Sequence, residues 1–241
     1  MGCKINTFII TFFLVFLSFC HTVYADTITD AIKAVAKNDY ASIKQLLDNG
    51  LDPNLKGKGS LQAALLNTAC DKGHIKIVQL LLSKGADVNL AGHGGGTQIM
   101  WAAGHAKTSD ILNLLLKKGA NIQAVDANGV SVLDKAVFGV VSKQTSMKSF
   151  KFLVGQGLDV NRSRQKGKTA GYTVLMVAAR WNHIELAKYL ISKDADVNAK
   201  AKIGDSPLSI AIEEKHEKMI SLLKKHGATT EIGRASCRER V

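Results

Sequence analysis

Seven histidines and four cysteines are the side chains of this sequence best suited to binding a metal ion or transferring a proton. His93 and His105 lie close together in the chain, but no cysteine or carboxylate stands beside them to complete a zinc site. The glycine-rich run 92–96 could cradle an anion, yet no Lys-Ser or Lys-Thr follows it as in a phosphate loop. The motifs of serine hydrolases and zinc proteases are also missing. We therefore expect no catalysis, no bound metal and no cofactor.

The N-terminal 25 residues have the organisation of a secretory signal peptide. A single charge, Lys4, precedes an apolar run of 13 residues, Phe8–Cys20, which is shorter than the roughly 20 residues of a bilayer-spanning helix. Val23 and Ala25 stand where signal peptidase requires small residues, so residues 1–25 are predicted to be cleaved. Retention as a membrane anchor is the alternative. Cleavage would leave a periplasmic or secreted protein with no stable membrane span.

Residues 232–241 have no apolar periodicity, and they read, residue for residue, as the translation of a DNA sequencing adapter. We predict that they are an artefact, with a genuine basic tail as the alternative. Setting aside both ends lowers the net charge from +12 to +9 and leaves one cysteine, Cys70. A single cysteine cannot form an intramolecular disulfide, and its place in the helix pattern predicts that it is buried.

A motif of the form Gly-x-Asp-x-Asn recurs along the chain at intervals of 33 to 38 residues. Its copies are Gly50–Asn54, Gly85–Asn89, Gly119–Gln123, Gly157–Asn161, Asp194–Asn198 and a degenerate Gly227–Thr230. An apolar helix pattern precedes each copy, and a shorter helix marked by small residues lies earlier in each unit. Each unit is thus predicted to be a helix pair and a turn, which buries its apolar face only by stacking on its neighbours.

These units resemble the ankyrin repeat over about residues 29–230, and the best copy runs from Gly171 to Asn198. The resemblance implies an all-α solenoid of about six helix-turn-helix repeats with short β-turn fingers, in a domain spanning 26–231. The predicted repeats are 26–54, 55–89, 90–123, 124–161, 162–198 and 199–230. The resemblance also implies that His74, His183 and His216, which share one repeat position, brace the backbone between helices instead of binding a metal.

In this family, partners are usually held by the concave face of the first helices and by the fingers. Alignment of this sequence with the family's repeat pattern places four residues on that face: Phe138, Tyr172, Arg180 and Trp181. They are expected to be exposed and are of the types that dominate interface energies. The alternative is that these aromatic side chains pack against the lengthened loops of their own repeats. Trp101 is expected to belong to the core.

An inserted finger after residue 161 is the second candidate surface, since it carries Arg162, Arg164, Lys166 and Lys168. Its charge suits an acidic protein or a phospholipid headgroup, and a solvated loop without a partner is the alternative. Nucleic acid is not expected, because the protein is predicted to be exported and no aromatic residues alternate with the basic ones.

We therefore expect an exported, monomeric, non-enzymatic module that binds a protein partner. Exported bacterial ankyrin proteins that support a periplasmic stress enzyme, or that act as immunity proteins against a toxin, have a similar layout. A secreted effector that binds a host protein is the alternative function.

Overall fold

Paired helices dominate the computed structural model, which describes residues 27–55, 65–105, 109–167 and 169–229. A helix at 27–36 comes first. It is followed by α2 (Tyr40–Asp48), α3 (Leu65–Lys72), α4 (Ile75–Ser83), the 3-10 turn η2 (His93–Gly95), α5 (Gln98–His105), α6 (Asp110–Lys117), α7 (Val132–Val141), α8 (Met147–Val154), α9 (Val174–Arg180), α10 (Ile184–Ile191), α11 (Pro207–Glu213) and α12 (Glu217–Lys225). Each predicted repeat contains one helix pair, and the predicted signal peptide and C-terminal artefact lie outside the described residues.

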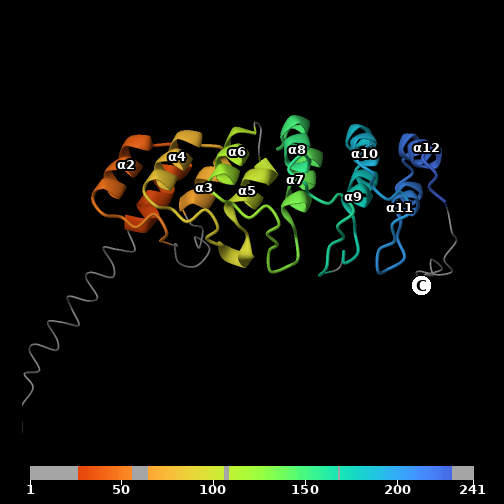
Figure 1. Cartoon of the computed structure of the whole chain (residues 1–241), viewed down its shortest axis with the longest axis horizontal. Helices are drawn as coiled ribbons and strands as arrows, with labels where there is room; N and C mark the ends of the chain where they lie inside the picture. The colour runs from red at the N-terminus through yellow and green to blue at the C-terminus, as the bar shows by residue number, and fades with distance from the viewer. Residues whose placement is uncertain (1–26, 56–64, 106–108, 168, 230–241) are drawn as a thin grey trace, which may run out of the picture.

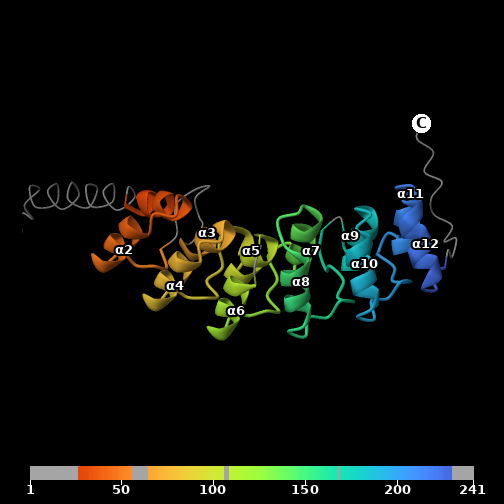
Figure 2. The same ribbon diagram turned by 90° about the horizontal axis from the view of Figure 1, so that it is seen from above.

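The helix pairs stack side by side into an elongated row, from the N-terminal pair at one end to α11 and α12 at the other (Figure 1). Seen from above, α4, α6, α8 and α10 line one side of the row, and α3, α5, α7 and α9 line the other (Figure 2). The described parts of the loops between successive pairs project toward one common edge (Figure 1). Within the described ranges, the one strand-like pairing is an antiparallel bridge between Val125 and Ser131 in such a loop. These observations confirm the predicted all-α solenoid with short turn fingers.

Local polar groups set the helix ends. Ser131 and Ser206 begin α7 and α11 with capping boxes, in which each serine and the third helical residue exchange hydrogen bonds. The second helix of each pair ends where the repeat motif begins, in a left-handed backbone conformation that glycine adopts without steric cost. In the fifth repeat Asp194 takes this conformation with a φ of 60°.

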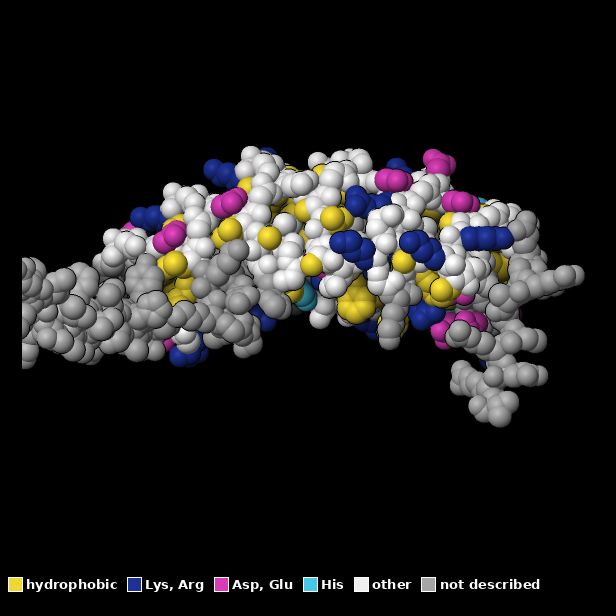
Figure 3. All heavy atoms as spheres, turned by 90° about the horizontal axis from the view of Figure 1, so that it is seen from below, with side chains coloured by type: hydrophobic (Ala, Val, Ile, Leu, Met, Phe, Trp, Pro, Cys, Tyr) yellow, Lys and Arg dark blue, Asp and Glu magenta, His cyan; other side chains and the backbone are white. Residues whose placement is uncertain are grey.

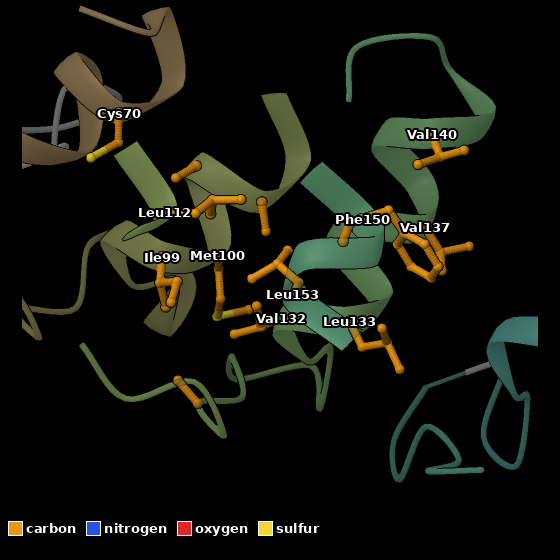
Figure 4. Close-up of a cluster of buried hydrophobic side chains, with 14 of the residues drawn as sticks. Cys70, Ile99, Met100, Leu112, Val132, Leu133, Val137, Val140, Phe150 and Leu153 are labelled. Atoms are coloured by element: carbon orange, nitrogen blue, oxygen red, sulfur yellow. The ribbon is translucent and has the colours of Figure 1, made fainter. Parts of the chain in front are cut away.

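One continuous hydrophobic core runs between the two layers of helices. Side chains of α5, α7 and α8 fill its central part, where Phe150 and Leu153 are completely buried (Figure 4). Burying a side chain of this size stabilises the fold by about 1.5–3 kcal/mol. Cys70 lies in the same core and is 2% exposed, as predicted. Burial raises the pKa of its thiol, which therefore stays protonated and unreactive at neutral pH.

In four repeats, the asparagine that closes the repeat motif links its repeat to the next one. Asn54 Nδ2 donates a hydrogen bond to the carbonyl oxygen of Gly85 (3.1 Å), and Asn54 Oδ1 accepts one from the backbone N–H of Asp87 (2.7 Å). We call this pair of bonds the asparagine bridge. The same bridge is made by Asn89, Asn161 and Asn198. The third repeat has Gln123 at this position, and the described structure shows no bridge from its side chain to the fourth repeat.

The first helices of the third and fourth repeats approach each other closely at a glycine. A Cβ atom on Gly139 would lie 2.3 Å from the carbonyl oxygen of Gly104 and 2.2 Å from Thr145 Oγ1. The buried Thr145 hydroxyl in turn donates to the carbonyl oxygen of Ala103 (2.8 Å), and its backbone N–H donates to the carbonyl oxygen of Gly139 (3.0 Å). The connection after α7 is therefore folded tightly onto α5.

Candidate protein-binding site

The helices α7 and α9 present three exposed side chains on neighbouring repeats. Phe138 on α7 and Trp181, which directly follows α9, each expose 58% of their surface, and Arg180 at the end of α9 is also exposed. Figure 3 shows exposed hydrophobic side chains at the positions along the row that α7 and α9 occupy, with basic side chains nearby. We call Phe138, Arg180 and Trp181 the aromatic–arginine patch. The alternative that the aromatic residues pack against loops is wrong for Phe138 and Trp181.

Tyr172 is buried, with 7% of its surface exposed, so the prediction that it is an exposed member of this surface is wrong. Its hydroxyl donates a hydrogen bond to Asp205 Oδ2. Its ring lies beside the guanidinium of Arg180, whose central carbon is 5.7 Å from the ring centroid, and Arg180 Nη2 donates to the tyrosine hydroxyl (3.3 Å). Tyr172 therefore supports Arg180 within the protein. Tyr172 and Asp205 occupy the same position in adjacent repeats, so the repeat alignment held the signal for this contact.

The hydroxyl of Tyr172 accepts a hydrogen bond from Arg180 and donates one to Asp205, so it links the guanidinium to the carboxylate. Among the described residues, no ion pair involves Arg180, so its charge remains available on the surface. Burial and the hydrogen bond to the Asp205 carboxylate raise the pKa of Tyr172 to about 12. The hydroxyl thus stays protonated at neutral pH and keeps donating to Asp205.

Alkaline titration should detect this network. An unfolded tyrosine ionises near pH 10, roughly 2 pH units below Tyr172 in the folded state. The stabilisation from the protonated hydroxyl is therefore complete below pH 10 and is lost as the pH rises toward 12. We expect ultraviolet difference spectra of wild type and Tyr172→Phe to show one tyrosine that ionises near pH 12. If the ionisation that disappears in Tyr172→Phe lies near pH 10 instead, the hydrogen bonds between Arg180, Tyr172 and Asp205 are contradicted.

The inserted finger does not present all of its positive charges to solvent. Arg164 Nη2 lies 3.2 Å from Asp134 Oδ1, and Arg164 Nη1 donates to Thr169 Oγ1 at 2.7 Å. The other carboxylate oxygen of Asp134 accepts hydrogen bonds from Ser131 at the start of α7. Arg164 thus ties the finger to the preceding repeat, and its assignment as a partner-binding residue is corrected to an internal role. Because Asp134 comes from another repeat, the composition of the finger gave no sign of this pair.

The remaining basic residues of the finger differ in exposure. Lys166 is exposed and Arg162 is half-buried, and neither side chain takes part in an ion pair within the described ranges. Lys168 lies outside the described residues. The assignment of Arg162 and Lys166 to a positively charged binding surface therefore stays a prediction.

Three histidines at equivalent repeat positions precede second helices. His216 Nδ1 lies 3.1 Å from the carbonyl oxygen of Ala179, and His74 Nε2 lies 3.5 Å from that of Ala36, in each case in the preceding repeat. His183 Nδ1 instead accepts a hydrogen bond from the backbone N–H of Leu186. The contacts of His216 and His74 confirm the predicted bracing role, whereas His183 caps its own helix, α10. The part of the chain that the structure describes contains no group of three or more side chains placed to hold a metal ion.

Sequence comparison agrees with the repeat architecture. The family described as "Ankyrin repeats (3 copies)" matches residues 31–126 and 138–233. The chain belongs to the ankyrin repeat family. Ankyrin repeats form a protein–protein interaction module, and the fold is generally a binding fold without enzymatic activity. No helix of this ankyrin repeat chain, within the described residues, is long and apolar enough to cross a membrane.

Relatives of this ankyrin repeat chain come from distant organisms. It is 32% identical over 192 residues to the nuclear factor NF-kappa-B p105 subunit of Gallus gallus, and 28% identical over 201 residues to an ankyrin repeat protein of Rickettsia bellii. An ankyrin repeat-containing protein of Treponema pallidum is 31% identical over 119 residues. The three alignments cover 77%, 80% and 49% of this chain, but only 19%, 26% and 37% of the relatives.

Proposed function

We propose that this ankyrin repeat protein is exported and binds a protein partner through the aromatic–arginine patch, without catalysing a reaction. The observation that carries the proposal is the exposure of Phe138 and Trp181, at 58% each, on α7 and directly after α9, with the exposed Arg180 next to Trp181 in the chain. When side chains of this size are covered by a partner, a large apolar area is removed from water. Trp and Arg are also the residues most enriched among interface hot spots.

Charge favours an acidic partner. The region 26–231 carries a net charge of +9, and Arg162 and Lys166 on the finger add positive charge to that of Arg180. A positively charged surface accelerates association with an acidic protein and discriminates against basic ones.

The predicted signal peptide supports export. Support of a periplasmic stress enzyme and neutralisation of a toxin are the two roles that suit a protein retained in the periplasm. A secreted effector bound to a host protein would instead be recovered from the culture medium. Fractionation of the native cells into medium, periplasm and cytoplasm distinguishes these locations.

Affinity capture with variants of the patch tests the binding role. We expect the purified chain to retain a partner from periplasmic extract, and we expect Phe138→Ala with Trp181→Ala to weaken retention by at least roughly 30-fold, because interface hot spots cost about 2 kcal/mol or more each. Ile203→Ala is the matched control, since Ile203 is a 64% exposed apolar residue on a finger outside the patch. Equal capture by the folded double variant and the wild type would contradict the assignment.

A further inference from the structure

We propose that the aromatic–arginine patch selects a partner segment with a fixed charge order: an acidic residue beside an apolar side chain over α7 and α9, and a basic residue over α11. This inference rests on the proposed function, because it assumes that the patch binds a protein. It adds the chemistry of the bound segment and the direction in which the segment lies.

The acidic residue of the segment is placed by Arg180. Arg180 is oriented by the ring and hydroxyl of Tyr172, while the carboxylate of Asp205 accepts the tyrosine hydrogen bond. A guanidinium held in one orientation binds a carboxylate with two parallel hydrogen bonds at a smaller entropy cost than a free side chain.

The apolar side chain of the segment is placed by Phe138 and Trp181. Both are 58% exposed, Phe138 on α7 and Trp181 directly after α9, so covering them removes a large apolar area from water. Phe138 and Arg180 occupy one repeat position in adjacent repeats, and Trp181 directly follows Arg180. An apolar residue and a carboxylate that bind here therefore come from neighbouring positions of the segment.

The charge of the surface reverses on the next helix. Glu213 and Glu214 stand on or directly after α11 at the repeat positions that Arg180 and Trp181 occupy on α9, and both are exposed. Glu213 lies close enough to Tyr172 for its charge to contribute to the raised pKa of that residue. The described structure pairs neither glutamate with a basic side chain. A segment that was acidic along its whole length would be repelled here, whereas a lysine or arginine would be attracted.

Peptide selection provides the first test. A library of random dodecapeptides displayed on phage is panned on the purified full chain and, in parallel, on the Phe138→Ala, Trp181→Ala variant. Peptides enriched only on the wild type should carry Asp or Glu within about one helical turn of a large apolar residue, and Lys or Arg on one consistent side of that pair. Peptides that are acidic throughout, or that have no charge order, would overturn the inference while leaving the binding role intact. If no enrichment depends on Phe138 and Trp181, the proposed binding role fails as well.

Exchange of the charges provides the second test. One enriched peptide is synthesised in its original form and with its acidic and basic residues exchanged, and both are titrated against wild type and the variant Arg180→Glu, Glu213→Arg. The protein variant should weaken binding of the original peptide by about fivefold or more, the size expected of one exposed ion pair, and should prefer the exchanged peptide. Equal affinity of both proteins for the original peptide would overturn the inference.

Two further measurements keep this test decisive. Circular dichroism verifies that the charge-exchanged chain is folded. If it is not, the single variants Arg180→Gln and Glu213→Gln are titrated against peptides with the matching charge neutralised. Non-additive changes in the binding free energy, when a protein charge and its peptide partner are both neutralised, support the charge order. Additive changes contradict it.

Discussion

Replacement of Gly139 by alanine should lower the free energy of unfolding by about 3 kcal/mol, because the added methyl group has no space. It would lie 2.3 Å from a backbone carbonyl oxygen of Gly104 and 2.2 Å from the hydroxyl oxygen of Thr145. The backbone atom belongs to the packed helix α5 and cannot turn aside like a flexible side chain. Relief of the clash would require α5 and α7 to separate, which would weaken the contact between the third and fourth repeats. Urea denaturation followed by circular dichroism measures the change.

Gly155→Ala is the matched control for this substitution. Gly155 is exposed and follows α8 with a φ of −62°, and a new Cβ atom would lie 3.3 Å from the carbonyl oxygen of Phe152 and 3.4 Å from that of Lys151, both in its own helix. Alanine there should leave the stability unchanged or raise it slightly, because it restricts the unfolded chain. An equally small effect at Gly139 would show that α5 and α7 do not approach as closely as described.

Loss of one asparagine bridge should produce the second large effect on stability. Asn161→Ala removes the hydrogen bond from Nδ2 to the carbonyl oxygen of Asp194 (2.9 Å) and the one from the backbone N–H of Asp196 to Oδ1 (2.7 Å). Each bond contributes about 0.5–1.5 kcal/mol, so we expect the free energy of unfolding to fall by about 2 kcal/mol. Chemical denaturation again provides the measurement.

The chain offers its own control for the asparagine bridge. Gln123 stands at the equivalent position in the third repeat without forming a bridge in the described structure, so Gln123→Ala should change the free energy of unfolding by less than about 0.5 kcal/mol. Equal losses from the two alanine substitutions would mean that the bridge does not stabilise the contact between repeats.

The fold followed from the sequence because a repeat supplies the same information several times. The period of the Gly-x-Asp-x-Asn motif located the ends of the second helices, and the apolar pattern between copies located the helices. The buried position of Cys70 and the bracing role of His216 followed from the same alignment, since each repeat position has a similar environment in every repeat.

The candidate site was harder to predict, because its side chains are positioned by residues in other repeats. Phe138 and Trp181 were placed correctly on the surface by their repeat positions alone. Tyr172 was not, since it is buried in the core and its hydroxyl donates a hydrogen bond to Asp205 in the following repeat. Arg164 was misassigned for a similar reason: its partner Asp134 lies in the preceding repeat, at a position where the family pattern has histidine.

The asparagine bridge also bears on how such a chain can change its length during evolution. Its two hydrogen bonds go to a backbone carbonyl and a backbone N–H, which almost every residue can supply, so the joint places little demand on the side chains of the neighbouring repeat. A whole repeat that is duplicated, deleted or exchanged between two such joints can re-form both of them. The joint after Gln123 offers no such link, so recombination there would have to conserve the helix contacts themselves, including the close approach at Gly139.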